Sequence, residues 1–336
     1  MANEANEKNK DAEVKHEQGT VYVDDKNLDI VLSTKPIGTF RLFWREIKAD
    51  PIALVSLILL VVIFLTVYIG AAIVESQMNP MQTNLIQQNQ SPGSLREFQQ
   101  TNFGEDSGWF RTSLGTDSGG RYITPLLFVG ARNSLNIGLS VAALSFVIGI
   151  AIGVVSGFFG GKVDFILMRF TDTVFMIPFL MIAIVLITLL DRTVWNFIWI
   201  LTAFSWMGRA RLIRAASLQN RNLDYVSASK TLGTKNSVII VREMLPNMVD
   251  VIVANFVLTV AASIGIETGL TVLGFGLGIE HPSIGALVTN ALMPINLTFF
   301  QWTWAPAIIL VILIMLCINF VGNALQRVAD PRQRLV

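Results

Sequence analysis

Long apolar runs alternate with polar connectors along most of the chain. An α-helix needs about twenty apolar residues to cross a bilayer. Five runs reach that length: 52–75, 135–159, 166–190, 249–275 and 303–325. A sixth run, 193–208, is shorter, but it contains no charged residue and has several Trp residues, which favour membrane interfaces. The pattern predicts an all-α multi-pass membrane protein with six transmembrane helices.

Basic residues are distributed unevenly among the polar connectors. The connector 209–248 and the C-terminal tail 326–336 contain many Lys and Arg residues, whereas 276–301 contains neither. Cytoplasmic loops of membrane proteins carry the excess of positive charge. We therefore expect both termini and 209–248 in the cytoplasm and the long segment 76–132 outside. If 193–208 did not span the membrane, the basic connector would lie outside, against this rule.

The first residues, 1–36, are polar and mixed in charge, without the apolar core of a cleavable signal peptide. They predict a polar cytoplasmic tail that is disordered through about residue 30. The next stretch, 37–51, is expected to form a short helix in the membrane interface. Its apolar face combines Phe40, Phe43, Trp44 and Ile47.

Small residues recur at every fourth position of the second apolar run: Ser145, Gly149, Gly153 and Gly157. On a helix this spacing forms one groove, in which the backbone of another helix can approach closely. We therefore predict a helix-packing role for these residues.

Three ionisable residues inside the apolar runs are candidates for a translocation pathway: Arg169, Asp172 and Glu267. Charged groups inside a membrane are functional candidates by default because they are costly there. Arg169 and Asp172 lie three positions apart, however, and an ion pair along one helix is the favoured interpretation. For Glu267 a structural role and a functional role both stay open.

Within the basic connector, 224–247 has the pattern of two short helices joined by a glycine. Asn222 or Asp224 can cap the first helix and Thr234 the second. Gly233 between them favours the left-handed conformation that ends helices, and Pro246 marks the turn into the next span. Small hydroxyl residues interrupt the apolar positions of the first helix, which favours docking to a protein over binding to lipid. These positions are Tyr225, Ala228 and Leu232, and the hydroxyl residues are Ser227, Ser229 and Thr231.

The composition excludes several kinds of chemistry. Only 15% of the residues are charged, whereas soluble domains have about a quarter. Cys317 is the single cysteine and His16 and His281 are the two histidines, which excludes an intrachain disulfide and a Cys/His metal site. The chain also has no phosphate-binding loop of the type that ATPases use. We therefore expect no enzyme activity, no bound metal and no cofactor.

Several motifs together resemble one family, the C-type permease subunits of ABC importers for oligopeptides, dipeptides and nickel. The loop of that family reads Glu-Ala-Ala, three residues, Gly and later Leu-Pro, and here it reads Ser227-Ala228-Ser229, Gly233 and Leu245-Pro246. Serines thus replace the Glu and the last Ala, and Tyr122 stands where an Asp is usual. The matching segments are LGTDSGGR (114–121), GAR (130–132), GFFGGKVDFILMRFTD (157–172), RARLIRAASL (209–218), YVSASKTLG (225–233), LPN (245–247), ETGLTVLGFGLG (267–278) and ADPR (329–332).

The resemblance implies a type I ABC importer permease fold, with a core domain at 133–325, in a bacterial plasma membrane. It also implies a B-type permease partner, two cytoplasmic ATPases that bind ATP and magnesium, and an extracellular solute-binding lipoprotein, but no nucleic acid. The loop residues that would couple the permease to an ATPase are Tyr225, Ser227, Ala228, Ser229, Leu232, Gly233, Leu245 and Pro246.

The resemblance favours peptides as the cargo, although nickel or another small solute stays open because the binding protein selects it. A secondary transporter is an alternative, but it would need inverted halves and buried acids for ion coupling, and the sequence shows neither. A membrane scaffold with a docking loop is a third alternative.

Overall fold

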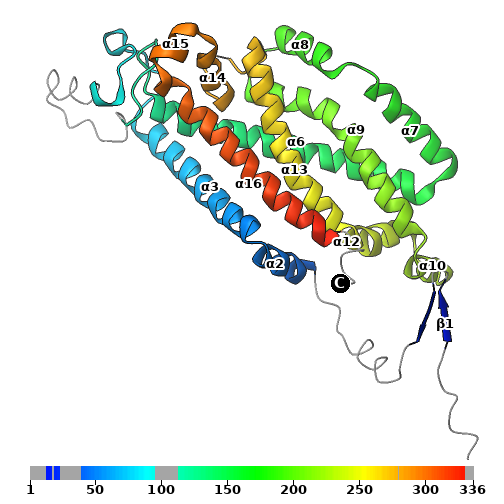
Figure 1. Ribbon diagram of the computed structural model, residues 1–336. Coiled ribbons are helices and arrows are strands. Elements are labelled where there is room, and N and C mark those ends of the chain that lie inside the picture. Colours follow the sequence, from blue (N-terminus) through cyan, green and yellow to red (C-terminus); the bar gives the residue numbers. More distant parts are fainter. Residues whose placement is uncertain (1–12, 17–18, 23–38, 95–112, 279, 330–336) are drawn as a thin grey trace, which may run out of the picture. The chain divides into compact units, whose positions relative to one another are not determined.

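The computed structural model describes residues 13–16, 19–22, 39–94, 113–278 and 280–329, and most of these residues are helical. The chain divides into two units, Met1–Arg45 and Glu46–Val336. The bounds of the α-helices are α2 Thr39–Ala49, α3 Pro51–Gln77, α6 Ile123–Phe159, α7 Gly161–Phe175, α8 Phe179–Leu189, α9 Val194–Arg221, α10 Asp224–Thr231, α11 Asn236–Val238, α12 Leu245–Asn247, α13 Val249–Leu270, α14 Ile284–Thr289, α15 Pro294–Phe299 and α16 Ala305–Ala329 (Figure 1).

The first unit contains a short antiparallel hairpin of β1 (Glu13–His16) and β2 (Gly19–Tyr22), with Val14 opposite Val21. The sequence favoured a disordered tail here, so the prediction was wrong for these residues. The β-branched side chains of Val14 and Val21 favour extended backbone.

Four helices of the described part of the chain are long and apolar enough to cross a membrane: α3, α6, α13 with its extension to Phe275, and α16. Helices α7 and α8 together make a fifth candidate, but they meet at an angle of 71°. The sequence pattern predicted one continuous span at 166–190. The break lies at Met176–Pro178, because proline disfavours helical backbone at the residue before it.

Two further boundaries differ from the pattern of apolar residues. Helix α6 begins at Ile123, so the end of the expected external segment 76–132 is helical. Helix α9 contains the run 193–208 almost entirely but continues to Arg221, well into the basic connector. Both helices therefore extend beyond the apolar residues that identified them.

Helices α6 and α9 approach each other closely along the small residues of α6. A Cβ atom added to Gly149 would lie 2.6 Å from the Arg209 Cβ atom, and one added to Gly157 would lie 2.6 Å from the Ser217 Cβ atom. Between them, a Cβ atom on Gly153 would lie 2.6 Å from the Ala210 carbonyl oxygen. Ser145, one turn further along, is fully buried. The predicted groove thus accommodates the backbone of α9.

Helices α3 and α16 are joined at one end through Asp50. The carboxylate caps α3 by accepting from the Ile52 and Ala53 N–H groups at 3.0 and 3.2 Å, and the Arg327 guanidinium of α16 donates to its second oxygen. Hydrogen bonds from the Ala53 N–H, the Arg327 guanidinium and the Ile52 N–H stabilise the ionised carboxylate. They hold the pKa of Asp50 below its ordinary value. Asp50 therefore stays ionised as both a helix cap and an ion-pair partner.

The substitution Gly153→Ala tests the contact between α6 and α9. We expect it to lower the thermal unfolding temperature, because the new methyl group would overlap a backbone oxygen that cannot move independently. Overpacking of this kind costs about 1–3 kcal/mol.

The matched control is Gly269→Ala in α13, where an added Cβ meets nothing within 4 Å. Alanine is the better helix former at both positions, so the control should keep or raise the unfolding temperature. Equal unfolding temperatures of the two purified variants in detergent would contradict the close contact.

Candidate functional site

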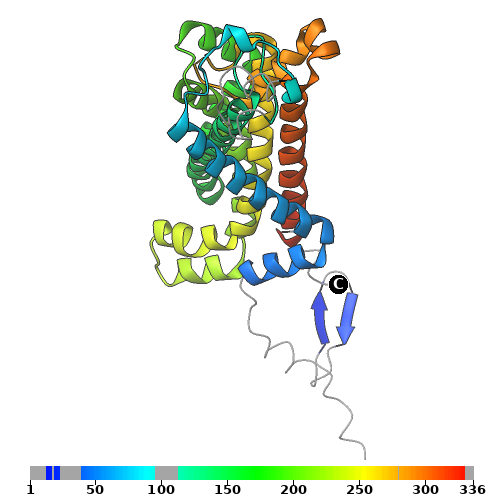
Figure 2. The ribbon, with the colours of Figure 1, turned by 90° about the vertical axis from the view of Figure 1, so that its left-hand side faces the viewer.

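Residues 224–247 form a jointed helical unit, which we call the coupling unit. It contains α10, a turn at Gly233, and then α11, a π-helix (Ile239–Met244) and α12. The unit extends sideways from the ends of α9 and α13 (Figure 2). Gly233 has φ +77°, a left-handed conformation that glycine adopts without steric cost. The glycine joint predicted from the sequence is therefore present.

The coupling unit has a small core of its own, which it shares with the end of α6. Val226, Ile239 and Met244 are fully buried there, together with Phe158 of α6. The Ser229 hydroxyl donates to the Glu243 carboxylate at 2.7 Å and so joins α10 to the π-helix. These contacts make the two helices one compact body against α6.

The face of α10 that carries Ala228 and Leu232 is exposed. Leu232 has 85% of its surface accessible, Ser227 and Ala228 are also exposed, and Tyr225 is half-buried. The periodicity of the sequence predicts this apolar stripe but not Val226, which is the residue of α10 that packs inward. In the sequence Val226 is a single apolar residue outside the stripe. Periodicity alone does not show that such an isolated residue packs inward.

Two details of the predicted loop were wrong, and both concern helix caps. Leu223 precedes α10, and neither Asn222 nor Asp224 caps it. Lys235 precedes α11, again without a side-chain cap, so Thr234 does not have the predicted role. Pro246 lies in the three-residue α12, directly before the turn at Met248 that leads into α13, which is close to the turn predicted from the sequence.

Two arginines on the extension of α9 form ion pairs with α7. Arg214 donates from two nitrogens to the two oxygens of Asp164, both at 2.6 Å, and Arg211 donates to Asp172 at 2.7 Å. The predicted pair of Arg169 with Asp172 along one helix is not formed, because Asp172 is held by α9. The Arg169 guanidinium instead lies over the ring of Phe165, 5.3 Å from its centre.

Arg169 and Asp172 line an open groove of about 420 Å³ beside these ion pairs. Its other lining residues are Gly161, Asp164, Phe165, Met168 and Arg214. The groove combines both signs of charge with apolar side chains.

Glu267 lies near the opposite end of the bundle and is fully buried. Its carboxyl group accepts a hydrogen bond from the Ser134 hydroxyl at 3.0 Å. The Thr271 hydroxyl lies 3.2 Å from the carboxyl group but donates over the shorter distance of 2.8 Å to the Glu267 backbone carbonyl oxygen. The carboxyl group therefore faces hydroxyl groups of the protein interior. Glu267 lines neither the groove beside Arg169 and Asp172 nor the cavity next to α14.

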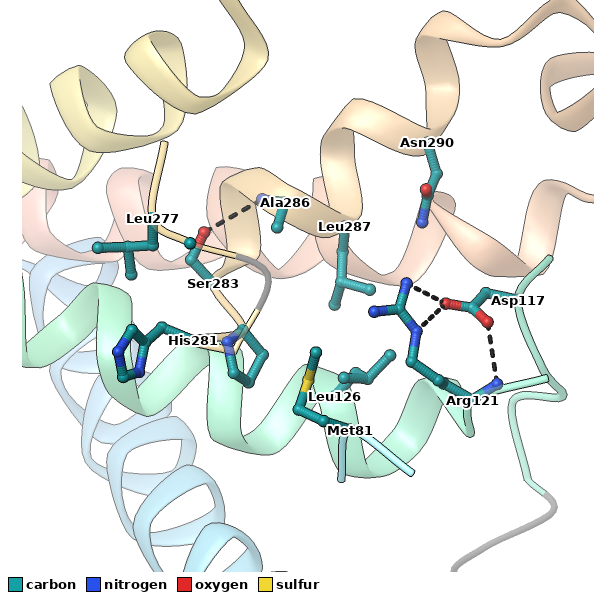
Figure 3. A pocket seen from close by; sticks show the side chains of 12 residues that line it. Met81, Asp117, Arg121, Leu126, Leu277, His281, Ser283, Ala286, Leu287 and Asn290 are labelled. Carbon is teal, nitrogen blue, oxygen red and sulfur yellow. Dashed lines mark hydrogen bonds and ion pairs between the residues drawn. The ribbon is translucent and has the colours of Figure 1, made fainter. Parts of the chain in front are cut away.

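A cavity of about 280 Å³ lies at this end of the bundle, between the 114–121 segment and α14 (Figure 3). The Asp117 carboxylate accepts from the N–H groups of Gly119 and Arg121 at 2.9 Å and pairs with the Arg121 guanidinium at 2.7 Å. The turn thus directs N–H donors at its own carboxylate. The cavity is lined by Met81, Asp117, Arg121, Leu126, Leu277, Gly278, His281, Pro282, Ser283, Ala286, Leu287 and Asn290.

Comparison with known proteins identifies the class. Residues 149–335 match the family described as "Binding-protein-dependent transport system inner membrane component", and residues 38–92 match the "N-terminal TM domain of oligopeptide transport permease C". The chain belongs to this family of importer permeases, as its motifs predicted.

Individual relatives cover most of the chain. The oligopeptide transport system permease protein OppC of Lactococcus lactis subsp. cremoris is 42% identical, over 86% of this chain and 93% of the relative. The dipeptide transport system permease protein DppC of Bacillus subtilis is 33% identical, over 87% and 85%. A chain of the inward-facing MetNI methionine ABC transporter superposes with a TM-score of 0.48 at 19% identity, over 60% of this chain and 96% of that one.

Double-mutant cycles can rank the two ion pairs between α7 and α9. We expect a larger coupling energy for Asp164→Asn with Arg214→Gln than for Asp172→Asn with Arg211→Gln. The first pair is bidentate and its carboxylate is 17% exposed, whereas both partners of the second pair are more than 40% exposed. Pairs of the second kind contribute about 0.2–1 kcal/mol.

The measurement is the unfolding free energy of the four single and two double variants in detergent. Each pair serves as the control for the other. A coupling energy that is equal for both pairs, or larger for Arg211 and Asp172, would contradict the ranking.

Proposed function

We propose that this chain is the membrane-spanning permease subunit of an ABC importer that moves peptides into a bacterial cell. The peptide cargo is supported by the similarity along most of the chain to permeases named for oligopeptide and dipeptide transport. Nickel or another small solute is the second candidate cargo, since the family resemblance includes nickel importers and the binding protein selects the solute.

In this proposal the coupling unit docks into a cytoplasmic ATPase. The observation that carries the proposal is a compact body that exposes Leu232 on one side and is packed against α6 on the other. An exposed apolar residue beside a polar helix face suits insertion into a groove of a partner protein. The ATPases, and not this chain, would bind ATP and magnesium.

Movement of the coupling unit would reach the membrane through α9 and α6. Helix α9 runs without a break from Val194 to Arg221, directly before α10. Its contact with Gly149, Gly153 and Gly157 leaves no space for sliding, so a displacement of α9 is passed to α6. Closure of the ATPases would thereby change the side on which the permease is open.

The proposed topology has six spans and both termini in the cytoplasm. The bent pair of α7 and α8 would be one span, and the apolar first part of α9 would be another. The coupling unit and the basic extension of α9 would then lie inside, in agreement with the distribution of positive charge. A B-type permease would complete the pathway, and the groove beside Arg169 and Asp172 is the part of this chain that we assign to it.

The substitution Gly233→Val tests the coupling role. Valine is strained at φ +77°, so the angle between α10 and the following helices should change. We expect ATP-driven uptake of a peptide by proteoliposomes to fall by about tenfold or more, corresponding to at least about 1.4 kcal/mol. ATP hydrolysis and assembly of the complex should persist.

The control is Gly274→Val, which introduces the same residue at φ +89° outside the coupling unit and away from both lined cavities, also with nothing within 4 Å of the added Cβ. Unchanged uptake in Gly233→Val, or an equal loss in both variants, would count against a specific coupling role for the joint.

The energy source separates this proposal from a secondary transporter. Depletion of ATP with the ion gradient intact should stop uptake, because the chain lacks the dense set of buried acids that ion coupling needs. Uptake is measured in cells with a labelled peptide. Continued uptake would contradict an ATP-driven importer, and collapse of the gradient with ATP retained is the reciprocal control.

A further inference from the structure

Helix α14 and the turn before it lie in close contact with α6 and α13 at the end opposite the coupling unit (Figure 1). A Cβ atom on Gly130 of α6 would lie 3.0 Å from the Ser283 carbonyl carbon. A Cβ atom on Gly285 would lie 2.7 Å from the Thr271 Cβ atom. The α14 segment is therefore packed directly against the backbones of its neighbours on this side.

The polar contacts of this interface converge on Glu267. The Ile284 N–H donates to the Ser134 hydroxyl oxygen at 3.1 Å, and that hydroxyl donates to Glu267 at 3.0 Å. The Ser283 side chain caps α14 by accepting from the Ala286 N–H at 3.1 Å. One buried carboxylate thus connects α6, α13 and the start of α14.

A buried carboxyl group of this kind favours two arrangements of α14, fully packed against α6 and α13 or fully displaced from them. Among the described residues no Lys or Arg is paired with Glu267, so hydroxyl groups alone compensate for its removal from water. Displacement of α14 would remove the Ile284 N–H that supports Ser134, and the carboxyl group held by Ser134 would then require water. Partial opening is the least favourable arrangement, because it leaves a buried polar group without its partners.

The other side of α14 faces the cavity of about 280 Å³ (Figure 3). Ala286, Leu287 and Asn290 of this region line the cavity together with Arg121 and Leu126 of the 114–121 turn and α6. Helix α14 is therefore hydrogen-bonded to α6 at its start and lines a cavity with Ala286 and Asn290, while Ile284 and Leu287 pack in the core that includes α16.

We propose that Glu267 is the positioning residue of a latch that holds α14 closed on the bundle, and that release of this latch moves α14 toward the cavity. The assignment of α14 as part of a transport gate rests on the proposed function. The latch itself is a property of this chain and can be measured without transport.

The experiment measures the reactivity of a cysteine at Leu287, which is 4% exposed, in a Cys317→Ser background. The full-length chain is purified in its assembled complex in detergent, without nucleotide, and treated with a maleimide. We expect slow labelling with native Glu267 and labelling about tenfold faster with Glu267→Ala, because the buried hydrogen bond to Ser134 is lost. Glu267→Gln, which retains an acceptor oxygen, should restore most of the protection.

The matched control is Thr259→Ala, which removes another buried polar group of α13. Thr259 is 3% exposed, and its hydroxyl donates to the Asn255 carbonyl oxygen of the same helix at 2.7 Å. A merely structural loss of buried polarity would accelerate labelling in this variant too, whereas a latch predicts no change.

Labelling of Glu267→Ala at the rate of the native residue, or equal acceleration in Thr259→Ala, would overturn the latch. If the complex with Glu267→Ala does not assemble, the same labelling experiment is done with Ser134→Ala. Faster labelling of that variant is expected, and unchanged labelling would contradict the proposal. Since no ATP or cargo is used, failure of peptide uptake would count against the proposed function alone.

Discussion

The contact between α6 and α9 is the constraint on which the rest of the structure depends. Between helices in lipid there is little hydrophobic driving force, so close packing must provide the attraction. The small residues Gly149, Gly153 and Gly157 permit it, because larger residues would overlap atoms of α9. With α9 fixed on α6, Arg211 and Arg214 come within reach of α7, and the end of α9 places α10 against Phe158.

Helix α6 also connects the two ends of the bundle. Phe158 contributes to the core of the coupling unit, and Ser134 belongs to the hydrogen-bond network of Glu267. These residues are 24 positions apart, which corresponds to about 36 Å at 1.5 Å per residue. A tilt of α6 against α13 would therefore displace both ends at once. This common element is the physical reason to consider the coupling unit and α14 parts of one mechanism.

The sequence predicted the features that depend on local pattern. The apolar runs lie in helices, the small residues lie in a close helix contact, and Gly233 lies in a left-handed joint. Side-chain partners across helices were not predictable, because periodicity gives the face of a residue but not its neighbour. Asp172 was paired with Arg169 on its own helix, whereas the structure pairs it with Arg211. The extension of α9 beyond 208 was missed because hydropathy indicates where the apolar stretch ends and not where the helix ends.

The two serines of the coupling unit have different consequences. The Ser229 hydroxyl is used within the unit, where it holds Glu243, and an alanine there could not form this hydrogen bond. Ser227 is exposed on the same helix as Leu232, so its change from the family pattern alters the surface and not the core. Position 227 therefore presents no carboxylate on the exposed surface. The carboxylate of Glu243 is instead held between α10 and the π-helix by Ser229. The shape of the unit is accordingly maintained by its own contacts, and position 227 affects only the surface that the unit presents.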